Sequence, residues 1–341
     1  MIGRAADAPR QEWPAELRSR LQDLLGDPER SWRLVEQEQL KRRVHRLRFR
    51  ADGEERSFVV KRSTPEVARR NQLLATRWLP AVGLEDHGPA LLALAPEPAV
   101  HRVWHVYEDL GRHVLESESP VRDHVEAAVG VLATLHTRSA GHPLLRECRL
   151  RGDDLGMRFY SSSVRAGLRA LRAMHVDDRD DRVIRIRERL MERLQRLHEE
   201  ERERALAVGA LRVPETLLHG DLWTVNVLLV PNGAGLRARL IDWDHVGAGP
   251  ISYDLSTFLL RFPRRDRPWI LDAYRRETER VAGWRLPPDA TLNPLFETAE
   301  YARLSSMVRG GGHAAGEPGA DWAVDRLESI DAWFEAFEPV L

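Results

Sequence analysis

The sequence predicts an α+β protein made of two parts, a small part rich in strands and a larger helical part. Apolar and polar residues alternate in the first third of the chain, most clearly over 44–49, which is typical of half-buried strands. After residue 121 the apolar residues recur every three or four positions instead, which is typical of amphipathic helices. The length of 341 residues allows two lobes with a sizeable core.

The first part is expected to be a small antiparallel sheet with one helix. Alternating runs bounded by turn residues predict strands at 33–40, 44–49, 57–60 and 103–107. The helix is expected to begin after Thr64, because a threonine hydroxyl caps the first helical N–H groups and Pro65 suits the first helical position. It should end near Pro80.

The second part is expected to be mostly helical. A helix is predicted over 121–139, with His136 near its end as a packed or capping residue. The run 185–204 alternates arginine and glutamate around apolar residues at helical spacing, as solvated amphipathic helices do. The glycine-rich segment 310–316 is expected to be a flexible loop, either a lid on the substrate side or the commoner plain connection.

Charge and composition argue against several classes of protein. Lysine and arginine total 52 and aspartate and glutamate 53, so no basic excess favours nucleic acid or an anionic membrane surface. No apolar run reaches the length of a membrane span and the first 17 residues lack a signal-peptide core, so a cytoplasmic enzyme is expected. Cys148 is the only cysteine, which excludes an internal disulfide. No pattern in the sequence sets an oligomeric state.

The clearest chemical signal lies in one short stretch. Asp221 is followed five positions later by Asn226, and a second aspartate, Asp242, ends the next predicted strand. In phosphoryl transfer an aspartate takes the proton of the attacking hydroxyl, while an asparagine and a second aspartate hold the metal ions. Strands at 227–230 and 240–241 should form a hairpin that brings Asn226 and Asp242 together, as a shared Mg²⁺ requires.

These residues resemble the aminoglycoside phosphotransferase and choline kinase family, the small-molecule relatives of the protein kinases. The motifs that carry the resemblance are His219-Gly220-Asp221-Leu222-Trp223-x-x-Asn226, Ile241-Asp242-Trp243 and Tyr253-Asp254-Leu255, with weaker echoes in Val59-Val60-Lys61 and Leu132-Ala133-Thr134-Leu135-His136. The resemblance implies a two-lobed, protein-kinase-like fold. Its expected domains are an N-terminal nucleotide-binding lobe at 1–105, a hinge at 106–112 and a helical lobe with the substrate site at 113–341.

The resemblance also implies an activity, the transfer of the ATP γ-phosphoryl group to a hydroxyl of a small molecule with the help of Mg²⁺. Asp221 would orient and deprotonate the hydroxyl, and Asn226 and Asp242 would bind the metal. Backbone groups of Glu108 and Leu110, at the hinge, would meet the adenine. No nucleic acid or membrane partner is expected.

Lys61 is the candidate for holding the α- and β-phosphates. Only Lys41 and Lys61 among the 52 basic residues are lysines, and a lysine kept in such a background suggests a need for a compact ammonium group. Lys61 ends a predicted strand, where the resemblance places the phosphate lysine. Lys41 lies in a basic cluster and is expected to be a solvated surface residue.

Some positions depart from the kinase pattern or have open roles. The segment 35–43, where a phosphate-covering loop is expected, has no glycine, so the loop is looser or side chains such as Arg42 do the covering. The helix after Thr64 has Asn71 near the place where an acidic partner of Lys61 is expected. Its one acidic residue, Glu66, lies in the first turn. A strand would put Asp244 on the same face as Asp242, toward the metal or the substrate. Asp254 is expected to cap a helix or support the catalytic loop.

The acceptor stays open between an antibiotic, an amino alcohol and a sugar. Cationic acceptors require acidic sites, and the acid-rich segment 177–181 is a candidate, although a solvated loop is the simpler interpretation. Trp223 also gives a resemblance to fructosamine kinases, whose acceptor is a sugar–amine adduct. The competing class is a pseudokinase, a nucleotide-binding or interaction protein without transfer activity. A protein kinase fits less well, because no activation segment follows Asp242 before Tyr253.

Overall fold

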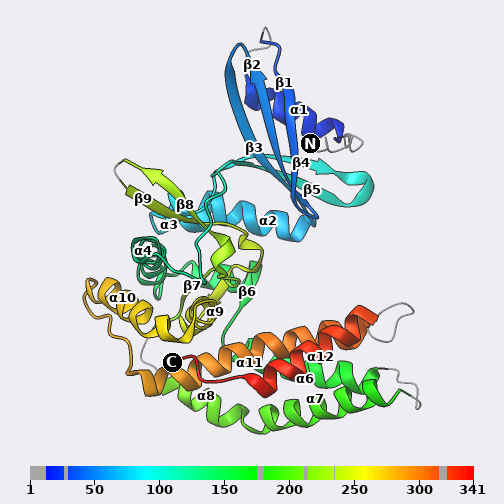
Figure 1. Ribbon diagram of the computed structural model, residues 1–341, viewed down its shortest axis with the longest axis vertical. Coiled ribbons are helices and arrows are strands. Elements are labelled where there is room, and N and C mark those ends of the chain that lie inside the picture. The colour runs from blue at the N-terminus through cyan, green and yellow to red at the C-terminus, as the bar shows by residue number, and fades with distance from the viewer. Residues whose placement is uncertain (1–12, 27–29, 175–179, 211–213, 234, 315–320) are drawn as a thin grey trace, which may run out of the picture. The chain divides into compact units, whose positions relative to one another are not determined.

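The computed structural model describes residues 13–26, 30–174, 180–210, 214–233, 235–314 and 321–341 (Figure 1). The chain divides into two compact units, Met1–Arg112 and His113–Leu341, and each is described here by itself. The first unit holds an antiparallel sheet and the second is mostly helical, as the sequence predicts.

The sheet of the first unit has five strands in the order β1-β2-β3-β5-β4, and all neighbours are antiparallel. The strands are β1 (Arg33–Lys41), β2 (Val44–Ala51), β3 (Glu54–Ser63), β4 (Leu91–Glu97) and β5 (Arg102–Glu108). Lys61 on β3 lies opposite Val44 on one side and His105 on the other. Directly opposite residues point to the same face, so Lys61 and His105 share one face of the sheet.

The opposite face is covered by α1 (Ala15–Leu25), a helix that the sequence analysis did not predict. Leu17, Leu21 and Leu25 are buried four residues apart on one side of this helix. They pack in one apolar cluster with residues of β2, β3, β4 and β5. Trp13, just before α1, joins this cluster and meets Trp104 edge to face, with ring centroids 5.4 Å apart.

The predicted helix of the first unit begins where expected and ends in an irregular way. Thr64 is its N-cap and accepts a hydrogen bond from the Val67 N–H, and Pro65 is its first residue. The regular part is α2 (Pro65–Leu73), followed by a π-helical turn (Leu74–Trp78) and by α3 (Leu79–Ala81). The Ala68 carbonyl of α2 lies 3.3 Å from Nε2 of His105, so α2 packs on the face that carries Lys61.

The second unit combines a three-stranded sheet and a two-stranded hairpin with a large set of helices (Figure 1). Its strands are β6 (Asp153–Asp154), β7 (Thr216–Leu218) and β10 (Gly247–Gly249), which form one sheet, and β8 (Val227–Asn232) and β9 (Gly235–Leu240), which form a hairpin. Its helices are α4 (Arg122–Ser139), α5 (Leu145–Arg151), α6 (Met157–Ala173), α7 (Asp181–Glu199), α8 (Glu201–Ala210), α9 (Ser252–Leu259), α10 (Arg267–Glu279), α11 (Asp289–Ala314) and α12 (Asp321–Ala336).

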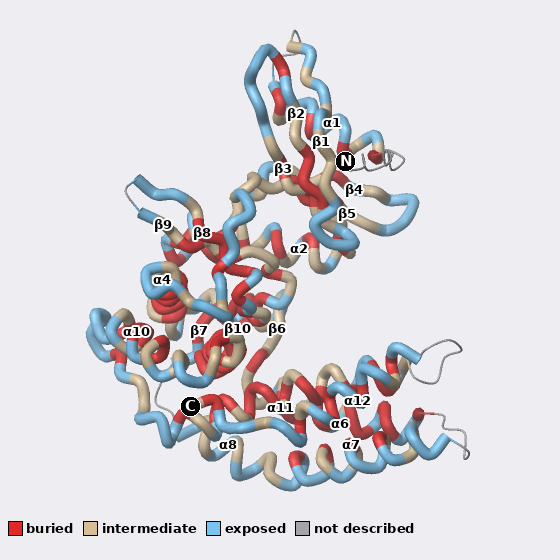
Figure 2. The backbone as a smooth tube through the Cα atoms, in the orientation of Figure 1, coloured by how far each residue is buried: buried red, intermediate tan, exposed pale blue. Residues whose placement is uncertain are grey.

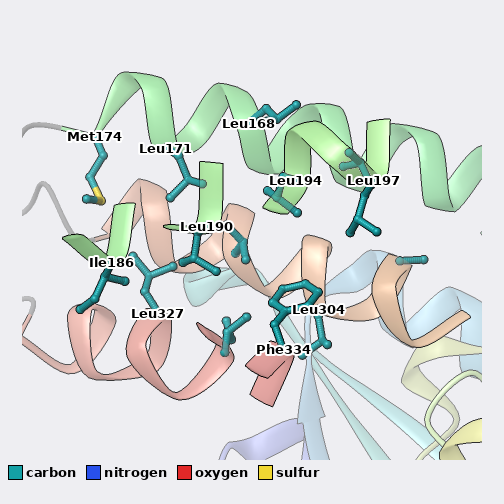
Figure 3. Packing of buried hydrophobic residues seen from close by; sticks show 14 of the residues in the cluster. Leu168, Leu171, Met174, Ile186, Leu190, Leu194, Leu197, Leu304, Leu327 and Phe334 are labelled. Carbon is teal, nitrogen blue, oxygen red and sulfur yellow. The ribbon is translucent and has the colours of Figure 1, made fainter. Parts of the chain in front are cut away.

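Four of these helices, α6, α7, α11 and α12, enclose an apolar core. Figure 3 shows the buried side chains that meet there, among them Leu168, Leu190, Leu194, Leu327 and Phe334. Figure 2 shows the same pattern along the chain, with buried residues on the inner sides of the helices and exposed residues on the outer sides. The charged run 185–204 therefore buries its apolar stripe here, as amphipathic helices do.

The glycine-rich segment is not the loop that the sequence predicts. Helix α11 continues to Ala314, and 315–316 lie outside the described residues. A Cβ atom on Gly312 would lie 3.0 Å from Cβ of Ala170 on α6, and one on Gly311 would lie 2.9 Å from Leu327 on α12. The glycines therefore let α11 pack closely against two neighbouring helices, which outweighs their poor intrinsic helix propensity.

Two further predictions concern the cysteine and the membrane. Cys148 is fully buried in α5, and burial raises the pKa of its thiol to about 12. Among the described residues, no helix combines the length and the apolar character that crossing a membrane would require.

Candidate active site

The three residues of the predicted phosphoryl-transfer motif lie around one hairpin of the second unit. Strand β7 leads into the loop that carries Asp221, a short 3-10 turn ends at Asn226, and β8 and β9 then pair with Val227 opposite Leu240. The Ile241 N–H donates to the Asn226 carbonyl at 2.9 Å. Asn226 and Asp242 therefore lie at the open end of one hairpin, which is the placement that the sequence predicts.

Gly220 sets the path of the loop that carries Asp221. Its φ is +82°, in the region that favours glycine, and a Cβ atom there would lie 1.9 Å from the backbone oxygen of His245. Both the backbone conformation and the close approach exclude a side chain. The turn delivers Asp221 directly after the buried strand β7.

Asp254 supports this loop from helix α9. Its Oδ2 accepts the His219 N–H at 2.7 Å and its Oδ1 accepts the Gly220 N–H at 2.9 Å. His136 on α4 lies 3.5 Å from the same carboxylate and 2.8 Å from the Tyr274 hydroxyl. The predictions of a supporting role for Asp254 and a packed position for His136 are confirmed.

The charge of Asp254 is compatible with its complete burial because of these contacts. Burial alone would raise its pKa, but the hydrogen bond and the charge of His136 and the Gly220 N–H hold the pKa below the ordinary value. Asp254 is thus a buried carboxylate whose hydrogen bonds fix the backbone on either side of the His219–Gly220 peptide.

His219 is itself a structural residue. Its ring lies 4.5 Å from that of Trp243, and its Nε2 lies 2.9 Å from the Ile241 carbonyl oxygen. The Asp221 N–H donates to its Nδ1 at 3.3 Å. Burial lowers the pKa of His219, so the neutral ring links the loop of Asp221 to the end of β9.

Asn226 has the features expected of a cation ligand. Its Nδ2 donates to the Asp221 carbonyl at 2.8 Å, which fixes the side-chain orientation. Its Oδ1 is buried and has no hydrogen-bond donor among the described residues. A buried amide oxygen without a donor is costly, and a bound cation would satisfy it.

Asp242 has an unusual backbone conformation. Its φ is +65°, and only three non-glycine residues of the described chain have a positive φ. Such strain is often found at functional sites. The next residues form a 3-10 turn (Trp243–His245) instead of a strand, so the argument that placed Asp244 on the same strand face as Asp242 is wrong.

The oxygen ligands available around the hairpin suit Mg²⁺ better than a metal ion that requires three or more protein side chains. Among the described residues, no group of three or more His, Cys, Asp or Glu side chains is arranged to hold a metal ion. Mg²⁺ in phosphoryl-transfer sites commonly takes one or two protein ligands and completes its shell with phosphate oxygens and water. One amide oxygen and one carboxylate match that pattern.

The predicted nucleotide residues lie in the first unit. Lys61 is half-buried near the end of β3. Glu108 ends β5, its N–H donates to the Ala90 carbonyl at 3.1 Å, and its Oε1 accepts the Ala90 N–H at 2.6 Å. Leu110 is half-buried two residues later. Their nucleotide roles stay predictions.

Helix α2, which packs on the face of Lys61, carries the two residues that the sequence analysis considered in place of an acidic partner for this lysine. Glu66 is exposed in the first turn of α2, where hydrogen bonds from its own backbone N–H and from Thr64 lower its pKa. Asn71 is buried. Glu66 therefore serves the start of the helix, in agreement with the sequence interpretation.

The acid-rich segment is described only in part. Residues 177–179 lie outside the described residues. Asp180 is the N-cap of α7, and its Oδ1 accepts the Val183 N–H at 3.1 Å.

One buried ion pair near the predicted hinge was missed by the sequence analysis. Arg46 on β2 contacts both carboxylate oxygens of Asp109, through Nε at 2.7 Å and Nη2 at 3.0 Å. Asp109 also accepts the Ser57 hydroxyl at 2.5 Å and the Gly111 N–H at 3.0 Å. Burial alone would raise the pKa of Asp109, but the bonds from Arg46 and Ser57 lower it. An arginine on a predicted strand was the only sequence signal.

The fold belongs to the two-lobed, kinase-like class, and the predicted fold class is confirmed. The structure of spectinomycin phosphotransferase APH(9)-Ia with ADP and spectinomycin matches with a TM-score of 0.57 at 15% identity, over 91% of this chain and 90% of that chain. Macrolide 2'-phosphotransferase MphH from Brachybacterium faecium matches with 0.53 at 17% identity, over 95% and 99% of the two chains. Plasmodium vivax ethanolamine kinase matches with 0.54 at 10% identity, over 89% and 81%.

The chain belongs to the phosphotransferase enzyme family, whose family model matches residues 36–287. No curated protein matches the sequence. The matched range includes Lys61 in the first unit and the whole hairpin with Asp221, Asn226 and Asp242 in the second. It excludes α1, α11 and α12.

Proposed function

We propose that this phosphotransferase uses ATP and Mg²⁺ to phosphorylate a hydroxyl group of a small molecule. The observation that carries the proposal is the buried Asn226 Oδ1, for which the described part of the chain offers no donor. It lies at the hairpin end that also holds Asp242, next to the loop of Asp221. The motif spacing and the family membership support the same reaction. The proposal assigns 1–105 to nucleotide binding, 106–112 to the hinge and 113–341 to the catalytic and substrate part.

Each residue of the second unit has a distinct task in the proposed mechanism. Asp221 accepts a hydrogen bond from the acceptor hydroxyl, orients its oxygen and takes its proton as the oxygen attacks. Asn226 Oδ1 and the Asp242 carboxylate would hold Mg²⁺, which when bound supplies positive charge to the phosphate oxygens. Gly220, His219 and Asp254 fix the position of Asp221, so that little reorganisation is required during the reaction.

In the first unit Lys61 is proposed to hold the α- and β-phosphates, and the backbone of Glu108 and Leu110 to meet the adenine. Spectinomycin is bound to one of the structural neighbours and ethanolamine kinase is another, so small hydroxyl compounds are reasonable acceptors to test. The set of Asp221, Asn226 and Asp242 argues against the pseudokinase alternative, because a protein without transfer activity has no need of all three. We also propose a cytoplasmic location.

Substitution of the base tests the proposal directly. Asp221→Asn keeps the shape and removes the proton acceptor, so kcat should fall by about 10² to 10⁴ while Mg·ATP binding persists. Acceptor phosphorylation and acceptor-free ATP hydrolysis are the measurements. Asp272→Asn is the matched control, because Asp272 is an exposed aspartate of α10 that pairs with Arg275. Full activity of Asp221→Asn would remove Asp221 from the mechanism.

The two lysines provide a second test. Lys61→Arg keeps the charge but replaces a compact ammonium by a larger planar group, so kcat/KM for ATP should fall by about tenfold or more. Lys41→Arg, at the end of β1, should change it little. Steady-state kinetics with varied ATP separate the two results. Equal behaviour of the two variants would show that Lys61 has no phosphate role.

A further inference from the structure

An arginine packs on an aromatic residue of the loop that carries the proposed base. Arg261 follows helix α9, and its positive charge interacts with the carboxylate of Asp221. Its guanidinium carbon lies 4.0 Å from the centroid of the Trp223 ring. Trp223 comes two residues after Asp221 and is 39% exposed, although it is a large aromatic residue. Asp221, Trp223 and Arg261 therefore occupy one region of the second unit.

The charge of Arg261 is not balanced by a close acidic partner. The residue is half-buried, and burial lowers the pKa of its guanidinium group. Its Nε is buried and has no hydrogen-bond acceptor. Within the described chain no carboxylate lies within 4.0 Å of Arg261, and Glu300 and Asp221 act on it only at longer range. A partly buried cation without a partner is costly, so its retention requires an explanation.

A neighbouring arginine, Arg303, also packs on an aromatic ring but has a paired acid. Arg303 on α11 is 15% exposed and donates to Glu300 Oε1 at 2.7 Å, while its guanidinium carbon lies 4.3 Å from the Tyr253 ring centroid. Glu300 also accepts the Ser256 hydroxyl at 2.7 Å. Glu300 is thus bonded to Arg303 and Ser256, whereas Arg261 has no paired acid among the described residues.

The chemistry of a stacked guanidinium indicates which ligand it can bind. When the flat group lies against an indole ring, its N–H bonds point outward in the plane of the group. They can then donate two parallel hydrogen bonds to a carboxylate or a phosphate. An ammonium or a guanidinium group of a ligand would instead be repelled.

We propose that Arg261 binds an anionic group, a carboxylate or a phosphate, on the acceptor whose hydroxyl is presented to Asp221. The acceptor is then an anionic hydroxyl compound, unlike the cationic aminoglycosides and amino alcohols that the family resemblance suggests first. This inference rests on the proposed function, because it assigns the acceptor of the same reaction. Trp223 positions the guanidinium group and forms the exposed wall of the acceptor site.

The main competing role for Arg261 is stabilisation of the transferred phosphoryl group. A cation with that role is required with every acceptor, and also with water in acceptor-free ATP hydrolysis. A cation that binds the acceptor is required only when the acceptor carries a negative charge. The two roles therefore differ in how the effect of an Arg261 substitution depends on the acceptor.

The experiment compares related acceptors with and without a negative charge. The probes are 4-hydroxybutyrate with 4-hydroxybutyramide, glucose 6-phosphate with glucose, and the aminoglycoside kanamycin as a cationic compound. Affinity is measured by calorimetry with nucleotide-free enzyme, and phosphorylation by ADP release. We expect at least one anionic probe to bind about 10- to 100-fold more tightly than its neutral partner, the range for a charge-assisted hydrogen bond. Arg261→Gln should remove this preference.

Two further variants sharpen the test. Arg261→Lys keeps the charge without the planar group and should retain only part of the preference. Arg265→Gln is the matched control, since Arg265 is 78% exposed in the loop after α9 and should keep the whole preference. Near-ultraviolet circular dichroism of each variant verifies the native fold.

Several results would overturn the inference. These are equal affinity for charged and neutral partners, tighter binding of kanamycin than of every anion, or an anion preference that survives in Arg261→Gln. An equal fall of acceptor-free hydrolysis and of anionic-acceptor phosphorylation in Arg261→Gln would assign Arg261 to the transferred phosphoryl group instead. Mg·ATP binding is measured in the same preparations. Its absence in the wild-type protein would refute the proposed function, whereas intact Mg·ATP binding without an anion preference refutes this inference alone.

Discussion

Two short segments, one in each unit, are held by an aspartate that accepts the N–H of a glycine of positive φ, but Asp254 is fully buried and Asp109 is only partly buried. In the first unit Asp109 is paired with Arg46 and accepts the N–H of Gly111, whose φ is +88°. In the second unit Asp254 accepts the N–H of Gly220, whose φ is +82°. The backbone requirement is the same at the two glycines.

The surroundings of the two glycines differ. A Cβ atom on Gly111 would meet nothing within 4 Å, whereas one on Gly220 would lie 1.9 Å from the His245 oxygen. Asp109 lies in the segment that it holds, whereas Asp254 lies on helix α9, 34 residues after Gly220 in the sequence. The loop of Asp221 is thus fixed by packing and by two backbone hydrogen bonds to Asp254, and the predicted hinge by the contacts of Asp109 with Arg46, Ser57 and the Gly111 N–H.

The largest expected effect comes from adding the same methyl group to both glycines. Gly220→Ala combines left-handed backbone strain with an overlap between its Cβ atom and the His245 backbone. It should lower the free energy of unfolding by more than about 4 kcal/mol. Gly111→Ala carries only the strain and should cost about 1 to 2 kcal/mol. Urea unfolding of the two variants gives both values. Equal losses would show that the approach of Gly220 to His245 is relieved by a small shift.

A smaller effect is expected from the same substitution at the two aspartates. Asp254→Asn leaves one carbonyl oxygen for two backbone N–H groups, so the free energy of unfolding should fall by about 2 to 3 kcal/mol. Displacement of Asp221 should also lower kcat by about 100-fold.

Asp109→Asn is the matched variant. It weakens the buried pair with Arg46 and should lower the unfolding free energy by about 2 to 4 kcal/mol. Because it leaves the loop of Asp221 intact, kcat per folded molecule should change less than in Asp254→Asn. A loss of turnover as large as that of Asp254→Asn would show that the pair of Arg46 and Asp109 is part of the catalytic mechanism.

The smallest effect is a difference in pH dependence. Burial lowers the pKa of His219 below its ordinary value of 6.5, so the unfolded chain takes up a proton below pH 6.5 that the folded loop does not, and the loop loses stability as the pH falls. Asp109 also has a lowered pKa, but its contribution is complete above its ordinary value of 3.8 and is lost only as the pH falls below that value.

Hydrogen exchange at individual amides measures this difference. Between pH 7 and pH 5, protection of 217–221 should fall relative to that of 108–112, after correction for intrinsic exchange rates. Global unfolding does not separate the two segments, because burial also lowers the pKa of His45 in the first unit. A parallel pH dependence of the two segments would contradict the role of neutral His219 in the loop.

Local patterns in the sequence predicted the elements that depend on near neighbours. Strands β1, β2, β3 and β5, the Thr64 cap and the hairpin around Asn226 follow from alternation, capping and turn residues within a few positions, whereas β4 was not predicted. The hairpin in turn predicts which chemical groups meet, because it joins residues only 16 positions apart, Asn226 and Asp242.

The features that escaped prediction depend on distant parts of the chain. Arg46 finds its partner 63 residues later, and no period in the sequence records such a pair. Gly311 and Gly312 were interpreted as a loop because glycine disfavours helices, but their role depends on the close approach of α6 and α12. Helix α1 was the exception, since the spacing of Leu17, Leu21 and Leu25 was visible in the sequence.

The burial of Cys148 has a practical consequence for measuring movements of this enzyme. Its thiol is inaccessible and stays protonated at neutral pH, so reagents that attack thiolates should pass it by. Engineered cysteines at exposed sites, such as Val100 in the first unit and Leu206 in the second, can therefore be labelled selectively without removing the native residue. A pair of spin labels or fluorophores at these sites would report the distance between the two units with and without nucleotide, in the otherwise unaltered protein.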